Sequence, residues 1–349
     1  MMSGEEPSQN AIMLTFNDKG IYCAQAAIYI DPWFPVDKAI ITHAHADHAR
    51  FGSKHYLCHR DSATLLKLRL GPQTSIQCLG YGEEIDINGV KVSLHPAGHI
   101  IGSAQIRLSY KGEVWVVSGD YKLERDGIST PFDPVKCHHF VSESTFGLPV
   151  YRFPEAYEVE RDMLNWIDNN RKANINSLMV GYSLGKAQRI IEVAGKTGLP
   201  IYAHGAIVNI QQRLIDDGHR LHNVAYASAD IKKIPAPYVV VMPPSALHSS
   251  WMKKFAPYEV AYCSGWMQLR GARRRRNVNR GFVLSDHADW SQLNLAITAT
   301  EAENIYVTHG YKSIYAKWLR EQYHVNAIEV DTLYEDDLLM QEDRDESIQ

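Results

Sequence analysis

The chain has 349 residues, of which 45% are hydrophobic and 22% are charged, and its formal net charge is -4. This composition is ordinary for a soluble globular protein with a sizeable core and room for one large domain or two. The small negative charge excludes a uniformly basic nucleic-acid-binding protein, so any such surface must be a local patch.

Five cysteines are scattered along the chain without a C-x-x-C pair, which favours a reduced cytoplasmic setting. No apolar run reaches membrane-spanning length, and the first six residues are acidic where a signal peptide would be basic. We therefore expect no membrane association. The acidic segment 335–349 is expected to fray.

The region from residue 13 to about residue 144 contains mostly short apolar runs separated by turns. We expect a hairpin around residues 17–20 and strands at 26–30, 36–42, 90–94, 104–108 and 114–117. Several of these strands are followed by a polar residue of catalytic type, namely Asp31, His99 and Asp120. This placement is typical of a site on the rim of packed sheets.

The densest cluster of metal-binding residue types, His-Ala-His-Ala-Asp-His at 43–48, follows the expected strand 36–42 directly. If His43 and His45 are extended, their spacing directs both imidazoles to one side, where they can hold one cation. A turn after the second alanine would direct Asp47 and His48 elsewhere. If the four ligands are divided in this way, two on each side, they favour two adjacent metals over one structural metal site. The alternative, a loop whose histidines only cap backbone groups, is disfavoured because this spacing rarely arises by accident.

Between residue 154 and about residue 280, helices and strands alternate. We expect helices at 155–169, 185–195 and 206–217, and strands at 177–182, 199–203 and 238–242. This alternation predicts an α/β unit with a parallel sheet.

After residue 281 the pattern of residues 13–144, apolar strands followed by polar residues, returns. A strand ends at the segment SDHAD (285–289), and a strand at 304–308 ends at His309, with helices expected at 291–300 and 313–322. We therefore interpret residues 150–280 as an insertion into a domain formed by residues 1–149 and 281–349.

The candidate ligands form two groups that share Asp120. One metal could be surrounded by His43, His45, His99 and Asp120, and a second by Asp47, His48, Asp120 and His309. Nitrogen and carboxylate ligands without a thiolate suit Zn²⁺ or Mn²⁺. Two such ions can lower the pKa of a shared water towards neutrality and stabilise an in-line phosphoryl displacement, which predicts hydrolysis by a metal hydroxide.

These motifs resemble the metallo-β-lactamase superfamily, through the pattern of residues 43–48, then His99 in HPAGH, then Asp120. Glu143 in ESTFG, His287 in SDHAD and His309 in THG are similar to the three extra motifs of the β-CASP nucleases. The resemblance covers residues 13 to 335. It implies an α/β fold, in which a metallo-β-lactamase αββα sandwich carries the dinuclear site at its rim and an α/β β-CASP cap domain is inserted.

The resemblance also implies roles for residues around the metals. It implies that Asp47 is a catalytic residue as well as a metal ligand. It makes Asp31 a carboxylate that orients the ligand imidazoles, with a turn residue as the alternative. It puts His287 near the scissile phosphate, contacting it or protonating the leaving oxygen, while Glu143 holds its ring. The alternative for His287 is a polar group at a helix N-terminus beside the Asp289 cap.

An arginine-rich run precedes the SDHAD segment. It consists of Arg270, Arg273, Arg274, Arg275, Arg276 and Arg280, with no acidic residue among them. Such a concentration of positive charge favours contact with a phosphate backbone, although a solvated face is an equal alternative for any single arginine. Lys186, at an expected helix start, is a further candidate for a phosphate contact, but the P-loop spacing needed for a nucleoside triphosphate is absent.

Within the β-CASP proteins, residues 264–290 resemble a bacterial exonuclease group whose genes accompany an ATP-dependent DNA ligase and a helicase. We therefore expect a metal-dependent DNA exonuclease of repair, functionally associated with a ligase and a helicase. A β-CASP ribonuclease remains the alternative, because a histidine at the position of His309 is common in RNA-processing members. A small-molecule hydrolase such as a thioesterase would not need the arginine run. An inactive binding protein would be expected to have lost ligands.

Overall fold

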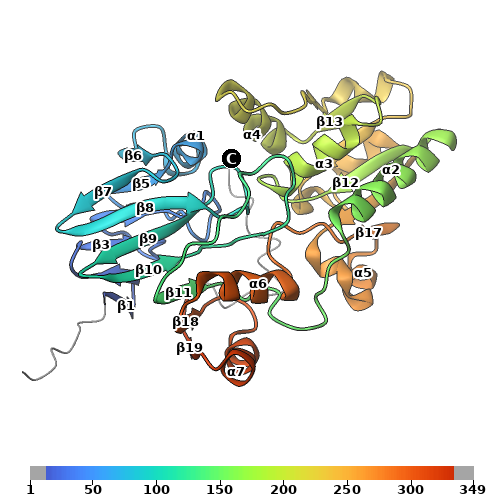
Figure 1. Ribbon diagram of the computed structural model, residues 1–349. Coiled ribbons are helices and arrows are strands. Elements are labelled where there is room, and N and C mark those ends of the chain that lie inside the picture. Colours follow the sequence, from blue (N-terminus) through green and yellow to red (C-terminus); the bar gives the residue numbers. More distant parts are fainter. Residues whose placement is uncertain (1–12, 334–349) are drawn as a thin grey trace, which may run out of the picture.

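The computed structural model describes residues 13–333, so the acidic segment 335–349, expected to fray, lies outside the described residues. Two β-sheets face each other in one half of the molecule, and a third sheet with its helices forms the other half (Figure 1). The first sheet follows chain order: β1 (Leu14–Asn17), β2 (Gly20–Cys23), β3 (Ile28–Ile30), β4 (Lys38–Ile40), β5 (His55–His59) and β6 (Ile76–Leu79). The predicted hairpin around residues 17–20 is confirmed, because β1 and β2 pair antiparallel there.

The second sheet has the order β19-β18-β11-β10-β9-β8-β7. Its strands are β7 (Glu84–Ile87), β8 (Val90–Pro96), β9 (Ala104–Tyr110), β10 (Glu113–Val117), β11 (His139–Ser142), β18 (Asn304–Val307) and β19 (Asn326–Glu329). It therefore combines strands that are far apart in sequence, since β11 pairs with β18 from His139 opposite Asn304, 165 positions later.

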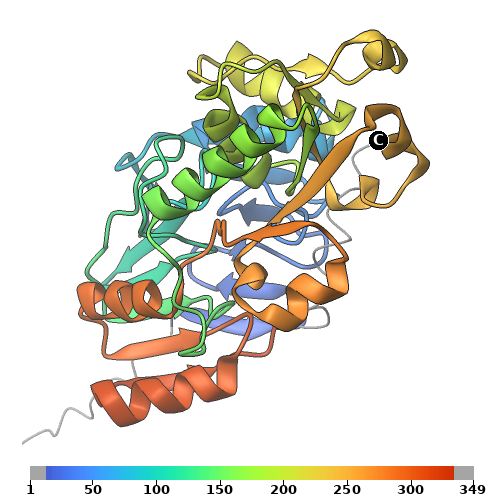
Figure 2. The same ribbon diagram turned by 90° about the vertical axis from the view of Figure 1, so that its right-hand side faces the viewer.

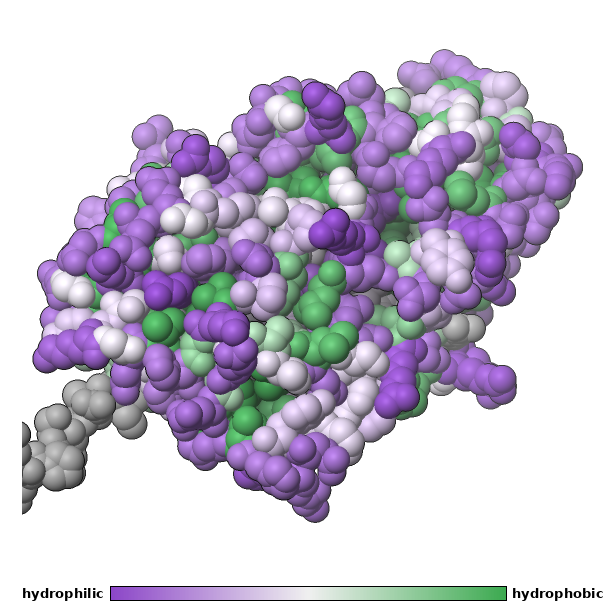
Figure 3. All heavy atoms as spheres, viewed as in Figure 1, coloured by the Kyte–Doolittle hydropathy of each residue, from purple (hydrophilic) through white to green (hydrophobic). Residues whose placement is uncertain are grey.

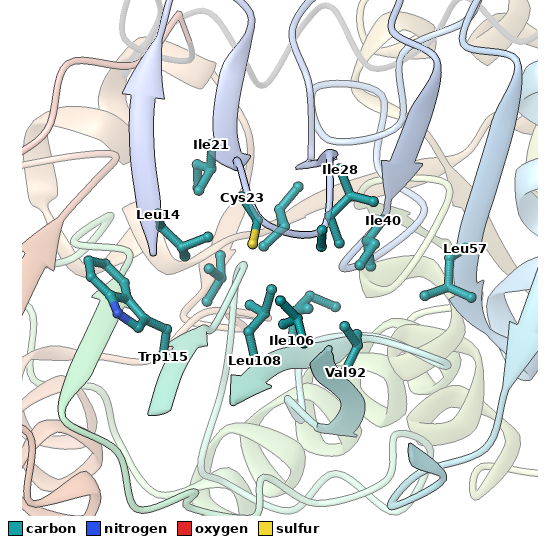
Figure 4. Close-up of a cluster of buried hydrophobic side chains, with 14 of the residues drawn as sticks. Leu14, Ile21, Cys23, Ile28, Ile40, Leu57, Val92, Ile106, Leu108 and Trp115 are labelled. Atoms are coloured by element: carbon teal, nitrogen blue, oxygen red, sulfur yellow. The ribbon is translucent and has the colours of Figure 1, made fainter. Parts of the chain in front are cut away.

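Apolar side chains from the two sheets meet in one core (Figure 4). Ile28 and Ile40 of the first sheet point towards Val92, Ile106 and Leu108 of the second, and all five are at most 2% exposed. Alternate residues of each strand supply this core, as the twofold repeat of a β-strand requires.

Helices cover the outer face of each sheet, so this half has four layers. Helix α1 (Ala63–Leu70) packs on the first sheet, and α6 (Trp290–Thr300) and α7 (Lys312–Tyr323) pack on the second. The last two helices were predicted, whereas α1 was not. Its sequence ATLLKLRL separates apolar from polar residues too weakly to reveal a helix.

The third sheet is parallel throughout, with the order β14-β13-β15-β12-β16-β17. Its strands are β12 (Asn176–Val180), β13 (Ile201–Ala203), β14 (Ala225–Tyr226), β15 (Val239–Met242), β16 (Tyr258–Cys263) and β17 (Arg280–Phe282). The helices of this half are α2 (Ala156–Lys172), α3 (Lys186–Gly195), α4 (Gly205–Asp216) and α5 (Arg270–Arg276). The predicted parallel α/β unit is confirmed, although β14 and β16 were not anticipated.

Short 3-10 helices complete the secondary structure: η1 (Arg60–Ser62), η2 (Ala229–Lys233), η3 (Pro244–Ala246), η4 (Ser250–Phe255) and η5 (Gly265–Gln268). After β17 the chain returns from the third sheet to the first half and continues into α6 (Figure 2). Hydrophilic side chains cover most of the face seen in Figure 3, where apolar groups form small patches. Among residues 13–333, no helix has the length and apolar character needed to cross a bilayer.

The strand directions bring several loops to one rim. β10, β11 and β18 are mutually parallel neighbours, so the loops after them leave the second sheet at the same edge. Those loops carry Asp120, Glu143 and His309, respectively. The candidate residues therefore converge because of sheet topology, although they are far apart in sequence.

The core between the first two sheets offers a test of this architecture. Replacing Ile106, which is fully buried, with alanine leaves a cavity, so Ile106→Ala should lower the free energy of unfolding by about 2–5 kcal/mol. Urea unfolding followed by circular dichroism would measure the loss. The control Leu295→Ala, at a side chain that is 62% exposed, should change stability by less than about 0.5 kcal/mol. Equal effects of the two substitutions would contradict the packing described.

Candidate metal centre

Seven potential ligands converge at the rim. His43, His45, His99 and Asp120 each offer one donor atom, and these atoms all lie within 4.8 Å of one another. The same limit holds for two further groups, one of His43, Asp47 and His48 and another of His48, Asp120 and His309. The structure thus brings together every residue predicted as a ligand. The first predicted group forms one cluster, whereas the second is divided, because Asp47 groups with His43 and His48, and His309 groups with His48 and Asp120.

The first group is built around three imidazoles. His43 Nε2 lies 3.1 Å from His45 Nδ1, and His99 Nε2 lies 3.0 Å from the same atom. Residues 43 and 45 are not in an extended strand, because β4 ends at Ile40, so both side chains project from a loop. A backbone hydrogen bond from Ala49 N to His45 O, 2.9 Å long, closes the turn that follows.

Asp120 lies between the two groups. Its Oδ2 atom is 3.4 Å from His43 Nε2, 3.5 Å from His48 Nε2 and 3.8 Å from His99 Nε2. It is also 4.0 Å from His287 Nδ1. One carboxylate therefore faces imidazole nitrogens from both groups, which is the position that a shared ligand requires.

The second group consists of Asp47, His48 and His309 together with Asp120. His48 Nε2 lies 3.5 Å from Asp47 Oδ2, and the rings of His48 and His309 are stacked with centroids 5.2 Å apart. Gly310 has a φ of +70°, and a Cβ there would lie 2.1 Å from the carbonyl oxygen of Ser144. Only glycine fits at that position, so the THG motif holds His309 against the loop after β11.

The turn that presents His99 depends on a glycine in the same way. Gly98 has a φ of +76°, and a Cβ there would lie 2.1 Å from the carbonyl oxygen of Lys122. The main chain before His99 can therefore approach the loop that carries Asp120 only because residue 98 has no side chain.

Asp31 supports two of the imidazoles from behind. Its Oδ2 atom lies 2.7 Å from His48 Nδ1 and accepts a 2.6 Å hydrogen bond from Thr42 Oγ1. Its Oδ1 atom accepts a 2.8 Å hydrogen bond from the backbone N–H of Thr42. The Thr42 hydroxyl is also 3.1 Å from His43 Nδ1. Thr42, which was not predicted as a site residue, thus links Asp31 to a second ring.

The electrostatics of the cluster suit divalent cations. Burial lowers the pKa of His43 and of His99 well below the usual value, which favours the neutral form that binds metals. Burial opposes ionisation of Asp120, but the surrounding imidazoles, His48 first, lower its pKa well below the usual range. The buried Asp120 Oδ1 has no hydrogen-bond partner among residues 13–333. An ionised, partly unsatisfied carboxylate beside His43 and His99, whose rings burial keeps neutral, fits a metal better than it fits a polar core.

His287 and Glu143 form a hydrogen-bonded pair beside this cluster. His287 Nδ1 lies 2.9 Å from Glu143 Oε2, and Glu143 Oε1 accepts a 2.8 Å hydrogen bond from the backbone N–H of Tyr121. Burial disfavours the charged imidazole, but Glu143 and then Asp120 raise the pKa of His287 to about 9. Asp289 caps α6 by accepting from Gln292 N, as expected, so His287 lies before the helix and faces the cluster.

A buried ion-pair network joins α3 to the segment before α6, and it was not predicted. Lys186 Nζ lies 3.7 Å from Asp286 Oδ2, and Arg189 Nη1 lies 3.3 Å from Asp286 Oδ1. Arg189 also donates a hydrogen bond to the carbonyl oxygen of Ser285. His99 Nδ1 is 2.8 Å from the carbonyl oxygen of Asp286, so these cations fix the main chain that orients a candidate ligand.

The position of Lys186 corrects a prediction. It begins α3 as expected, but it is only 5% exposed, and its ammonium lies 4.1 Å from the centre of the Tyr182 ring as well as near Asp286. A buried ammonium that is paired with a carboxylate is not accessible to a phosphate backbone. Helix position can be read from the sequence, whereas burial cannot.

The arginine-rich run forms α5 and its flanks. Arg270, Arg274, Arg275 and Arg280 are exposed. Arg280 lies 3.9 Å from Asp162, and Arg276 lies over the Tyr262 ring, whereas the Arg273 side chain lies outside the part that the structure describes.

Aromatic contacts connect the arginine-rich helix to the candidate centre. The ring of Trp266, in η5 just before α5, is 4.8 Å from that of Phe146, which is 6.2 Å from that of His287. The arginines are thus carried by a segment that packs beside the cluster of candidate ligands.

The chain is similar to several curated proteins over part of their length. No family model matches the chain. A protein of Opitutus terrae named "Probable DNA ligase" is 29% identical over 306 residues, which are 87% of this chain and 30% of that protein. The human "DNA cross-link repair 1A protein" is 32% identical over 167 residues, or 45% of this chain and 16% of that protein. "RNase aCSPSF2" of Saccharolobus solfataricus is 30% identical over 129 residues, which are 36% of this chain and 26% of that protein.

These relatives include DNA-repair and RNA-processing proteins of the β-CASP family of the metallo-β-lactamase superfamily, and the chain is similar to that family. Among β-CASP proteins, its relatives include the bacterial DNA-ligase-associated group. The chain spans less than a third of the length of each of the three relatives. A crystal structure of a protein of unknown function from Enterococcus faecalis superposes with a TM-score of 0.58 at 12% identity, over 84% of this chain and 79% of that one. At this identity the likeness concerns the fold alone.

The contacts of Asp31 predict an effect on metal binding. Asp31→Asn keeps an acceptor for Thr42 but removes the charge that faces His48 Nδ1, so affinity for Zn²⁺ should fall by about 10–100-fold. Competition with a chromogenic chelator would measure it. Asp37→Asn, at an exposed carboxylate paired with Lys54, is the matched control and should leave affinity unchanged. Unchanged affinity in Asp31→Asn would mean that Asp31 is only a turn residue.

Proposed function

We propose that this chain is a metal-dependent nuclease, a hydrolase of phosphodiester bonds that acts as a DNA exonuclease in repair or processing. The observation that carries the proposal is the position of Asp120, whose Oδ2 atom faces both ligand groups and lies 4.0 Å from His287. Two divalent ions, Zn²⁺ or Mn²⁺, would supply activation of water and stabilisation of negative charge on a phosphate.

Each residue then has a task in that reaction. His43, His45 and His99 would hold one ion, Asp47, His48 and His309 the other, and Asp120 both.

His287 is the candidate for proton transfer and phosphate contact. Its Nδ1 atom is held by Glu143, so Nε2 is the atom available to donate a proton to the leaving oxygen or to contact the phosphate. Its raised pKa suits a donor, because the ring carries the proton at neutral pH.

The domain arrangement follows from the same family. We assign residues 1–149 and 281–349 to a metallo-β-lactamase domain with the αββα layers, and residues 150–280 to an inserted β-CASP cap. The assignment is supported by the third sheet and its helices, which gather into their own apolar clusters. In this arrangement the arginine-rich α5 belongs to the cap and would hold the nucleic acid strand over the metals.

DNA is favoured over RNA as the substrate. The relative that aligns over 87% of this chain is named "Probable DNA ligase", whereas "RNase aCSPSF2" aligns over 36%. We accordingly propose a functional association with an ATP-dependent DNA ligase and, from the resemblance to the ligase-associated group, with a helicase. RNA remains the second candidate because a histidine occupies position 309, as is common in RNA-processing members. A cytoplasmic location is supported by the five free cysteines.

The activity can be tested with purified protein, Mn²⁺ or Zn²⁺, and end-labelled single-stranded DNA, double-stranded DNA and RNA. We expect stepwise shortening of DNA from an end, and slower cleavage of RNA. His43→Ala and Asp120→Ala should each abolish cleavage, because each removes a donor from the shared cluster. Circular dichroism would check that the fold persists.

The control for these variants is His55→Ala, at an exposed imidazole on β5, which should keep full activity. Full activity in His43→Ala or Asp120→Ala would refute the two-metal site. Preferential cleavage of RNA would overturn the choice of DNA and leave the nuclease assignment in place.

The exposed arginines of α5 generate a separate prediction. Arg274→Gln combined with Arg275→Gln should weaken binding to DNA and reduce the slope of log affinity against log salt by about 1 for each lost phosphate contact. Fluorescence anisotropy at several salt concentrations would measure the slope. Arg171→Gln with Lys172→Gln removes two cations already paired with Asp168 and serves as the control. An unchanged slope in the α5 variant would mean that these arginines only face solvent.

A further inference from the structure

Two of the five cysteines are neighbours across strands β5 and β6, which lie side by side next to α1 (Figure 1). Cys58 is paired in register with Cys78, and the two side chains hydrogen-bond to each other. Directly paired residues of adjacent strands point to the same face, and adjacent strands lie about 4.8 Å apart. That spacing falls within the range of Cα separations that a disulfide spans, about 4.4–6.8 Å.

The two thiols differ in access. Cys58 is fully buried and packs with Leu65 and Leu66 of α1 in the cluster beneath that helix. Cys78 is exposed on β6, which is the edge strand of its sheet. One thiol can therefore be reached by a small reagent from solvent, while its partner is sheltered but within contact.

The surroundings of Cys78 favour its thiolate. The hydrogen bond from Cys58 first, and then the nearby charges of Lys67 and Arg60, lower the pKa of Cys78 to about 6. By contrast, burial raises the pKa of Cys137 and of Cys263 to about 12. A thiolate is the nucleophilic form, so Cys78 differs in reactivity from the buried cysteines of this chain.

We propose that Cys58 and Cys78 form an oxidative modification site, in which a hydroperoxide oxidises Cys78 and Cys58 then closes a reversible disulfide. The two thiols are paired in register and in contact, and only Cys78 is exposed to solvent. An exposed, reactive thiol next to a resolving thiol is the arrangement expected of a redox-sensitive site.

The chemistry balances in two steps. The Cys78 thiolate attacks one oxygen of hydrogen peroxide, an S–O bond forms as the O–O bond breaks, and hydroxide leaves with the electron pair. The Cys58 thiol then loses its proton and attacks the sulfur of Cys78, so that an S–S bond forms, the S–O bond breaks and water leaves. Two thiols are oxidised by two electrons and one peroxide is reduced to two waters. A small dithiol reverses the change by exchange.

The experiment uses the folded full chain, reduced, desalted and exposed to a small excess of hydrogen peroxide before the remaining thiols are alkylated under denaturing conditions. Peptide mass spectrometry should find Cys58 and Cys78 joined in one linked pair, lighter by two hydrogens, and dithiothreitol should release it. Cys23, Cys137 and Cys263 are buried internal controls and should be alkylated as before.

Single variants separate the two roles. In Cys58→Ser, which lacks the resolving thiol, Cys78 should accumulate as a sulfenic acid that dimedone traps. In Cys78→Ser, loss of the Cys58 thiol to peroxide should slow by about tenfold or more. Cys263→Ser is the matched control and should behave like the parent chain.

Two results would overturn the proposal. One is the absence of the linked pair while Cys58 remains a free thiol. The other is an unchanged rate of Cys58 oxidation in Cys78→Ser. Neither readout depends on nuclease activity, so the outcome is independent of the proposed function.

Discussion

The site depends on one buried carboxylate. Asp120 is 5% exposed, and its Oδ2 atom lies within 3.4 to 4.0 Å of nitrogens from four imidazoles. Burying a charge is costly unless other charges compensate for it, and the rings of His43 and His99, which burial keeps neutral, carry no such charge. Two divalent cations would balance the carboxylates here. Because β10, β11 and β18 run parallel, the loops that follow them bring Asp120, Glu143 and His309 to the same rim.

The halves of the molecule are coupled through a second set of charges. Arg189 of α3 contacts Asp286 as well as Asp126, which lies 2.5 Å from Lys122. Burial favours the neutral form of Asp286, but Lys186 and Arg189 lower its pKa well below the usual range, so the Asp286 carboxyl is ionised. Because the carbonyl of the same Asp286 faces His99, the half that contains the third sheet contributes to the orientation of a candidate ligand of the first half.

The sequence was sufficient for features that depend on local spacing. The pattern at 43–48, the polar residues after strands and the alternation in 154–280 predicted the convergence of the candidate ligands, their rim position and the parallel sheet. Features that arise from contacts between distant residues were missed. Arg189 and Asp286 are 97 positions apart, and no local pattern reveals their pairing. Lys186 was misjudged for the same reason, since its burial depends on the packing of α3 against the segment before α6.

The central claim is that two metal ions share Asp120. Electron paramagnetic resonance of the protein titrated with Mn²⁺ tests it most directly, because it reports both the number of bound ions and any magnetic coupling between them. The account predicts two equivalents with the spectrum of a spin-coupled pair, and loss of that coupling in Asp120→Asn. A single equivalent, or two ions with uncoupled spectra in the parent chain, would contradict it.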